Sequence, residues 1–209
     1  MIRGPFMKLT LSAAALLTAS CINVNVPIGG DSSSSAIVWS LEHPDADAWG
    51  ISSDYVIRVK DFSSVQSLQR VDMVVQLEDG SLNRANTDVW SARPMELLPD
   101  DLAGDLISSG AWGAVLRQAT MLSEDFIVEG FIRHFGGMED AGVWSAVLDI
   151  DVTVLDGSDN SLIFQKNYRL DWDLPDPSYS SLATGMASLV SIFNEEVMGD
   201  IWSTMLPVR

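Results

Sequence analysis

Cysteine and histidine are scarce in this chain of 209 residues. Cys21 is the only cysteine, and His43 and His134 are the only histidines. The chain therefore cannot form an internal disulfide, and neither histidine has a second histidine or a cysteine at the spacing that zinc or copper sites use. The fold must be held by its apolar core, which a hydrophobic content of 47% can supply.

Positive charge and long hydrophobic runs are also scarce. Twelve lysines and arginines stand against 29 acidic residues, which gives a formal charge of −17. Such a charge disfavours nucleic acid and anionic membrane surfaces as partners. Beyond the N-terminal region no apolar run approaches about 18 residues, so we expect no membrane-spanning helix.

The common catalytic motifs are missing as well. The chain has no Gly-x-Ser-x-Gly elbow, no phosphate-binding loop and no Gly-x-Gly-x-x-Gly sequence. Asp149 and Asp151 share one strand face and could do glycosidase chemistry, although a solvated face explains them better. Asp156, Asp159 and Asn160 could hold calcium, but turn chemistry explains them better. We therefore predict a protein that is not an enzyme and that holds no metal ion.

The N-terminus has the pattern of a secretory signal peptide. Lys8 is followed by an apolar stretch at residues 9–17 and by small residues up to Cys21. The end of this segment resembles a bacterial lipobox, although Thr18 stands where leucine is usual and Leu17 lies one residue further back. We predict that residues 1–20 are removed and that Cys21 carries a diacylglycerol and an N-acyl chain. The alternative is a free cysteine in an ordinary secreted protein.

A lipidated Cys21 would anchor the protein to a membrane. Residues 21–36 contain Pro27, two glycines and four consecutive serines, so we predict a flexible tether there. Ile22 follows the cysteine, where aspartate would favour the inner membrane, so we expect the periplasmic face of the outer membrane. The remainder, residues 37–209, is predicted to form a single domain.

The first half of the domain reads as short strands followed by a helix. Alternating or short apolar runs predict strands at residues 37–41, 55–62, 73–77 and 82–89, with a tight turn at Asp79-Gly80. Pro99 and the acidic residues after it predict the start of a helix that ends at Gly110. Residues 112–119 read as a short extended segment.

The second half shows clearer periodicity. Strands are predicted at residues 124–135, with Gly130 as a bulge, and at 143–155 and 162–172. A long helix should run from Ser178 or Ser180 to Trp202, with its apolar stripe against the face of the hairpin that carries Trp144. This order predicts an α+β fold: a mostly antiparallel sheet with two principal helices packed against it in a two-layer sandwich.

The tryptophans suggest where a partner could bind. Trp144 and Trp172 are predicted to lie in the core. Trp90 and Trp112 neighbour small residues, so together with Arg93 and Met95 they are candidates for an exposed partner-binding surface. The alternative is that Trp90 and Trp112 fill the gap between helix and sheet.

The order of parts resembles a known family. Residues 73–90 form an apolar strand pair that leads through Asn86 to Trp90-Ser91, and Pro94-Met95-Glu96-x-Leu98 and a helix follow. A long hairpin at 126–170 and an amphipathic helix close the chain. This pattern is similar to the ABC-type transport auxiliary lipoprotein family over nearly all of the mature chain. The chain departs from the family in having only Asp54-Tyr55 where a tyrosine-rich strand is usual.

The resemblance implies a function. Members of the family are outer-membrane-anchored periplasmic subunits of MCE-type lipid transporters, such as the paraquat-inducible membrane-integrity system. It implies a non-enzymatic adaptor that docks the MCE-domain protein of an ABC transporter so that phospholipid can pass between the membranes, and a homo-oligomer by analogy. The alternatives are a lipoprotein that activates a peptidoglycan synthase or assembles an outer-membrane protein, and a secreted hydrolase.

Overall fold

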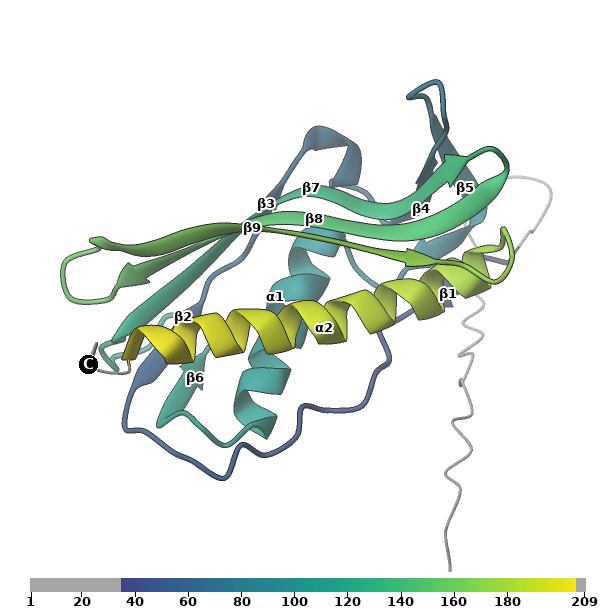
Figure 1. Cartoon of the computed structure of the whole chain (residues 1–209). Helices are drawn as coiled ribbons and strands as arrows, with labels where there is room; N and C mark the ends of the chain where they lie inside the picture. Colours follow the sequence, from purple (N-terminus) through teal and green to yellow (C-terminus); the bar gives the residue numbers. More distant parts are fainter. Residues whose placement is uncertain (1–34, 206–209) are drawn as a thin grey trace, which may run out of the picture.

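The computed structural model describes residues 35–205, which form one sheet and two long helices (Figure 1). The predicted signal peptide at residues 1–20, Cys21 and nearly all of the tether lie outside the described residues. The elements are β1 (Ile37–Trp39), β2 (Val56–Val59), β3 (Ser63–Ser64), a 3-10 turn (Gln66–Leu68), β4 (Asp72–Gln76), β5 (Leu82–Trp90), α1 (Pro94–Ser108), β6 (Ala114–Leu116), β7 (Phe126–Asp140), β8 (Val143–Asp156), β9 (Leu162–Asp173) and α2 (Tyr179–Met205).

The sheet is organised around β7, which has 15 residues. One edge of β7 pairs in turn with β2, β3 and β4, and all three run parallel to it. Its other edge pairs with β8 over its whole length, and β9 follows as the outermost strand. Three short strands can share one edge because β7 is long enough to span them.

The predicted antiparallel character of the sheet is wrong. Five of the eight described strand pairings are parallel, and only β4–β5, β7–β8 and β8–β9 are antiparallel. The three antiparallel pairs join neighbours in the sequence across short turns, which leave a local signal. The parallel pairs join strands that lie far apart in the chain, so no local pattern predicts them. The α+β class and the two helices are confirmed.

Two glycines explain why β7 is longer than predicted. The strand was predicted to end at residue 135, yet β7 continues through Gly136 and Gly137 to Asp140. A side chain at Gly136 would clash with the backbone carbonyl of Val74, and a Cβ at Gly137 would lie 2.9 Å from Val75. These glycines therefore allow β4 to approach β7, and they do not mark a turn.

The bulge of β7 also lies elsewhere than predicted. The register with β8 shifts between Ile132 and His134, not at Gly130. A Cβ at Gly130 would lie 2.7 Å from the ring of Phe62, so this glycine makes room for a buried aromatic side chain. His134, expected at the end of a strand, lies inside β7.

Helix α1 begins five residues before the predicted start. Arg93 is its N-cap and forms a capping box with Glu96, and Pro94 occupies the first helical position. Pro99 was expected in the first turn but lies inside the helix. Leu102 and Leu106 are buried on one face of this helix, whereas Ile107 is exposed.

Helix α2 packs along β8 and β9, and both helices lie on the same side of the sheet (Figure 1). Its predicted apolar stripe is confirmed: at most 1% of each side chain is exposed for Leu182, Met186, Leu189, Val190, Phe193, Val197 and Ile201. The opposing residues of β8, from Ala146 to Val154 at alternate positions, are also buried. Among residues 35–205, no helix combines the length and the hydrophobicity needed to cross a membrane.

Candidate functional site

Trp90 and Trp112 are core residues, so the expectation that they form an exposed surface is wrong. Trp90 is 2% exposed and packs edge-to-face on Phe135 with ring centroids 5.1 Å apart. Trp112 is 9% exposed and packs on Trp202 at 5.5 Å. The small residue beside it leaves no room for a partner, because a Cβ at Gly113 would lie 2.6 Å from the backbone carbonyl oxygen of Asp54.

The prediction for Trp172 is wrong in the opposite direction. This residue was predicted to lie in the core, but 48% of it is exposed. Trp172 pairs with Ala146 in the β8–β9 ladder, so its side chain lies on the face of the sheet that the helices cover. The first turns of α2 cover the C-terminal end of β9 only in part. Trp144 is half-buried: its indole Nε1 donates to Glu139 at 3.3 Å and its ring packs on Tyr179.

Arg93 and Met95 lie at the start of α1. The Arg93 side chain is 45% exposed and forms an ion pair with Glu96, whose pKa this guanidinium lowers. Met95 is half-buried, and its sulfur lies 3.9 Å from the hydroxyl of Ser64. Of the four predicted partner-binding residues, Arg93 is the one whose side chain a partner can reach freely.

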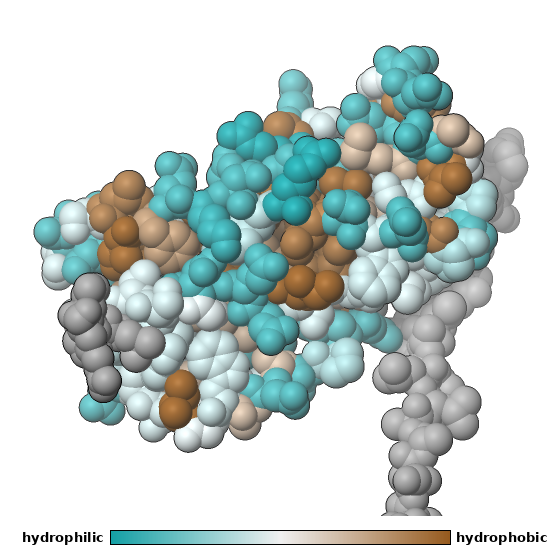
Figure 2. Space-filling model, in the orientation of Figure 1, coloured by the Kyte–Doolittle hydropathy of each residue, from teal (hydrophilic) through white to brown (hydrophobic). Residues whose placement is uncertain are grey.

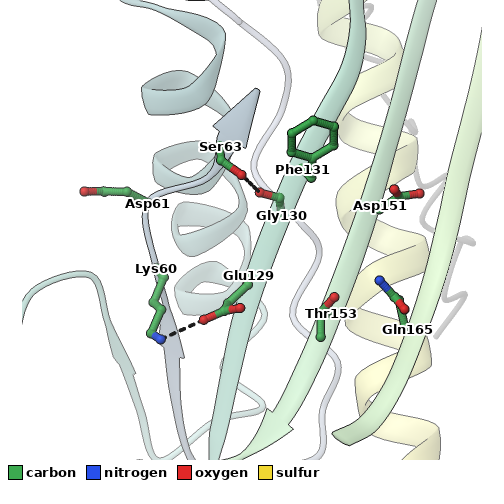
Figure 3. A pocket seen from close by; sticks show the side chains of 9 residues that line it. All are labelled: Lys60, Asp61, Ser63, Glu129, Gly130, Phe131, Asp151, Thr153 and Gln165. Carbon is green, nitrogen blue, oxygen red and sulfur yellow. Dashed lines mark hydrogen bonds and ion pairs between the residues drawn. The ribbon is translucent and has the colours of Figure 1, made fainter. Parts of the chain in front are cut away.

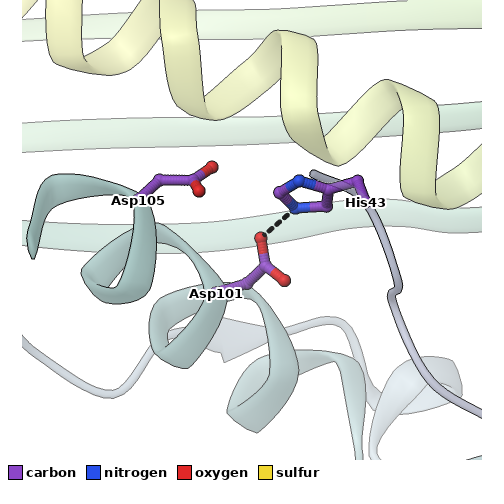
Figure 4. A group of neighbouring side chains, drawn as sticks. All are labelled: His43, Asp101 and Asp105. Carbon is purple, nitrogen blue, oxygen red and sulfur yellow. Dashed lines mark hydrogen bonds and ion pairs between the residues drawn. The ribbon is translucent and has the colours of Figure 1, made fainter. Parts of the chain in front are cut away.

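A polar cluster that the sequence did not predict joins three segments, and Figure 4 shows three of its side chains, those of His43, Asp101 and Asp105. His43 comes from the connection between β1 and β2, Asp101 and Asp105 lie one turn apart on α1, and Asn194 lies on α2. His43 Nε2 is 2.7 Å from Asp101 Oδ1. The amide nitrogen of Asn194, which is fully buried, donates to Asp101 and Asp105 at 2.8 Å each.

This cluster is best explained as a structural clamp. The hydrogen bond to Asp101 raises the pKa of His43 to about 9, so the imidazole is positively charged at neutral pH. The backbone N–H of Ala46 also donates to Asp105, which ties the incoming segment to α1. His43, Asp101 and Asp105 have the donor types of a metal site. A cation would have to displace the proton of His43, which the raised pKa opposes.

Asp149 and Asp151 do not form a catalytic pair. Asp149 binds Arg169 at 3.0 Å, and Asp151 accepts a hydrogen bond from Arg133 at 2.8 Å. The Arg133 guanidinium lowers the pKa of Asp151, which disfavours the protonated form that a general acid needs. The amide of Asn167 bridges both carboxylates. The pair is therefore part of an ion-pair network on the outer face of the sheet.

The acidic turn after β8 is explained by turn chemistry. Asp156 Oδ1 accepts hydrogen bonds from the N–H and the hydroxyl of Ser158 at 2.8 and 2.6 Å. Asp159 accepts from the N–H of Ser161 in the same way. Asn160 has a positive φ of 59°, which asparagine tolerates better than most residues. These carboxylates act within the turn itself.

Several exposed apolar residues were missed by the sequence analysis. Met121 and Leu122 lie in the connection between β6 and β7, and Met121 is fully exposed. Phe131 is 38% exposed on the outer face of the sheet. On the face shown in Figure 2, apolar residues form small separate groups among polar ones. A loop position or a single outward residue in a strand leaves no periodic signal that would reveal such sites.

A family model matches most of the chain. Residues 40–198 match the model described as ABC-type transport auxiliary lipoprotein component. The match covers β2 to β9 and α2 as far as Met198, so it includes most of the helices and strands that build the core and leaves out β1 and the last turns of α2. Among curated proteins, none matches the chain.

Solved structures share the fold. Protein XCC0632 from Xanthomonas campestris, of family DUF330, has a TM-score of 0.71 at 14% identity, over 80% of this chain and 95% of that one. An uncharacterized protein has a TM-score of 0.62 at 16% identity, and the match covers 76% of this chain and 99% of that one. The hypothetical protein CT253 from Chlamydia trachomatis has a TM-score of 0.51 at 14% sequence identity, and the match covers 71% of this chain and 96% of that one. At these identities the similarity establishes the fold alone.

Proposed function

Because the chain belongs to the ABC-type transport auxiliary lipoprotein family, we propose that it is the non-enzymatic docking subunit of an MCE-type transporter that moves phospholipid between the inner and outer membranes. Its family makes it an auxiliary lipoprotein component of ABC-type transport. The match over residues 40–198 is the observation that carries the proposal, since it covers most of the packed domain.

The packing of the domain favours a role in docking a partner protein rather than a role in carrying lipid itself. Residues from both helices and the inner sheet face fill one continuous core. A pocket on the outer face of the sheet has a volume of about 230 Å³ and a mostly polar lining. Pockets for drug-sized ligands have about 300–1,000 Å³ and mostly apolar walls. In this proposal the phospholipid passes through the partner, and this chain holds the partner in place.

We place the protein on the periplasmic face of the outer membrane. Cys21 would carry the lipid, and the tether would let the domain reach a partner at some distance. Arg93 and Met95 at the start of α1, and the exposed loop residues Met121 and Leu122, are the proposed contacts, because exposed apolar groups beside polar ones suit an interface. Trp90 and Trp112 would support these surfaces from within the core.

Affinity purification tests the proposed function. The tagged full-length protein is purified from solubilised envelope, and the proteins that accompany it are identified. We expect an MCE-domain protein together with its ATPase and permease. Recovery of a peptidoglycan synthase or an outer-membrane assembly factor without any transporter subunit would show that the protein serves another envelope machine.

A further inference from the structure

A pocket lies on the side of the sheet that faces away from the helices (Figure 3). Its floor consists of outward-pointing residues of β7, β8 and β9, and the segment that links β2 to β3 forms one wall. Its volume is about 230 Å³. The lining residues are Lys60, Asp61, Ser63, Glu129, Gly130, Phe131, Asp151, Thr153 and Gln165.

Phe131 gives the pocket an aromatic wall. It is 38% exposed on a face whose neighbouring positions are polar. The guanidinium of Arg133 lies 5.7 Å from the centre of its ring, but Arg133 does not line the pocket. Because Phe131 lines the pocket and is 38% exposed, part of its side chain is accessible to a ligand. An exposed aromatic ring of this kind is typical of recognition surfaces.

The charges around the pocket are balanced. Lys60 Nζ is 2.7 Å from Glu129, and Asp61 is 3.0 Å from Arg117. Asp151 is held by Arg133 on the adjacent strand. Each lining charge thus has an opposite partner. The pocket offers neither the free cation that a phosphate or sulfate would need nor the free carboxylates that a metal ion would need.

Two lining side chains keep free hydrogen-bonding groups. Thr153 and Gln165 lie directly opposite one another in the β8–β9 ladder. Among residues 35–205, neither the Thr153 hydroxyl nor the Gln165 amide has a hydrogen-bond partner within the protein. Together they offer donors and acceptors of both kinds, and Lys60 and Glu129 have further capacity beyond their mutual bond.

We propose that this pocket binds a neutral hexopyranose unit of a saccharide. A pyranose ring has an apolar C–H face that can pack on Phe131, and hydroxyl groups that can bond to Gln165 and Thr153. The balanced charges favour a neutral ligand, and the small volume favours a single ring. A free sugar and one residue of a glycan chain share this chemistry. The proposal does not depend on the transport role.

Calorimetric titration of the full-length lipoprotein tests the proposal. The protein is kept in a detergent without a sugar headgroup and titrated with glucose, N-acetylglucosamine and the N-acetylglucosamine trimer. We expect saturable binding of at least one of them with a Kd below about 10 mM. Tighter binding of the trimer identifies a glycan chain as the natural source, and equal binding identifies a free sugar. The absence of binding to all three would overturn the proposal.

Variants locate the binding. Phe131→Ala and Gln165→Ala should each weaken binding about tenfold or more, which corresponds to about 1.4 kcal/mol. Trp172→Ala is the matched control, because it removes an exposed aromatic ring that faces the other side of the sheet, and it should bind as the wild type does. Thermal melting checks that each variant is folded. Unchanged affinity in folded Phe131→Ala, or tighter binding of glucose 6-phosphate than of glucose, would also overturn the proposal.

Discussion

Trp90 is a single residue whose burial makes it important for the stability of the fold. Its indole is 2% exposed and packs on Phe135 between sheet and helices. We predict that Trp90→Ala lowers the free energy of unfolding by about 3–5 kcal/mol, because it leaves a large cavity. Trp172→Ala, which truncates a ring that is 48% exposed, should cost about 1 kcal/mol or less. Urea unfolding of both variants measures the difference, and equal losses would contradict the packing.

His43 makes the stability of the protein depend on pH. Its pKa is raised from 6.5 to about 9 by the hydrogen bond to Asp101, so the folded state holds a proton that the unfolded state releases. This contribution is complete below pH 6.5 and is lost as the pH rises towards 9. We expect the free energy of unfolding to fall by on the order of 2 kcal/mol across this range. In His43→Gln that fall should be missing; a slope as steep as that of the wild type would argue against the clamp.

Arg93 tests the proposed partner contact. It is exposed at the N-terminus of α1 and its ion pair with Glu96 is local. We predict that Arg93→Ala reduces co-purification of the transporter several-fold, with a loss of stability of about 1 kcal/mol or less. Arg70→Ala is the control, because Arg70 is also exposed and pairs locally, with Asp72. If both variants co-purify as the wild type does, Arg93 is not a contact.

At the level of elements, periodicity predicted β8, β9 and α2 well. The observed strands Val143–Asp156 and Leu162–Asp173 begin at the predicted residues and end one residue beyond the predicted ends. Alternation is clear in these strands because one face packs on α2 and the other meets solvent. The same holds for α2, whose stripe is long enough to be unambiguous. A helix or strand with one buried face can therefore be predicted from the periodicity of its apolar residues.

Features set by distant partners were not predictable in this way. The parallel pairing of β7 with β2, β3 and β4 joins segments separated by α1 or by other strands. Gly136-Gly137 looks like a turn until β4 is placed beside it. His43 lies 58 residues from Asp101, so the clamp has no sequence motif. Trp90 and Trp112 were misplaced for the same reason, since their burial depends on Phe135 and Trp202.

Two glycines of α2 give an element-level test of its packing. A Cβ at Gly185 would lie 2.7 Å from Leu174 and 3.1 Å from Ala146 of β8, whereas nothing lies within 4 Å at Gly199. Alanine improves helix propensity equally at both sites, by about 0.8–1.0 kcal/mol. We therefore predict that Gly199→Ala stabilises the protein and that Gly185→Ala destabilises it. An equal gain at both positions would mean that α2 does not pack closely on β8.

At the scale of the whole molecule, charge limits what the domain can bind. Every lysine and arginine between residues 35 and 205 lies within 4.0 Å of a carboxylate. With a formal charge of −17 for the chain, the surface has an excess of acidic groups and no unpaired cation in its described part. The domain itself should therefore not adhere to anionic lipid headgroups. Membrane attachment would rest on the N-terminus.

Lipidation of Cys21 is the whole-molecule prediction that follows. Two or three acyl chains would hold the protein on a membrane nearly irreversibly, because each buried CH₂ contributes about 0.8 kcal/mol. We predict that Cys21→Ser moves the protein from the outer-membrane fraction to the soluble periplasm or leaves it uncleaved.

A substitution at Ile22, the residue after the cysteine, tests the choice of membrane separately from anchoring by the lipid. Ile22→Asp keeps Cys21 and its lipid, but it introduces the residue that favours retention in the inner membrane. In density-gradient fractionation we expect this variant to move to the inner membrane while it stays lipidated. Cys21→Ser that remained with the outer membrane would show that the lipid is not the anchor. Ile22→Asp that stayed there would show that the residue after the cysteine does not choose the membrane, even if the lipid holds the protein on it.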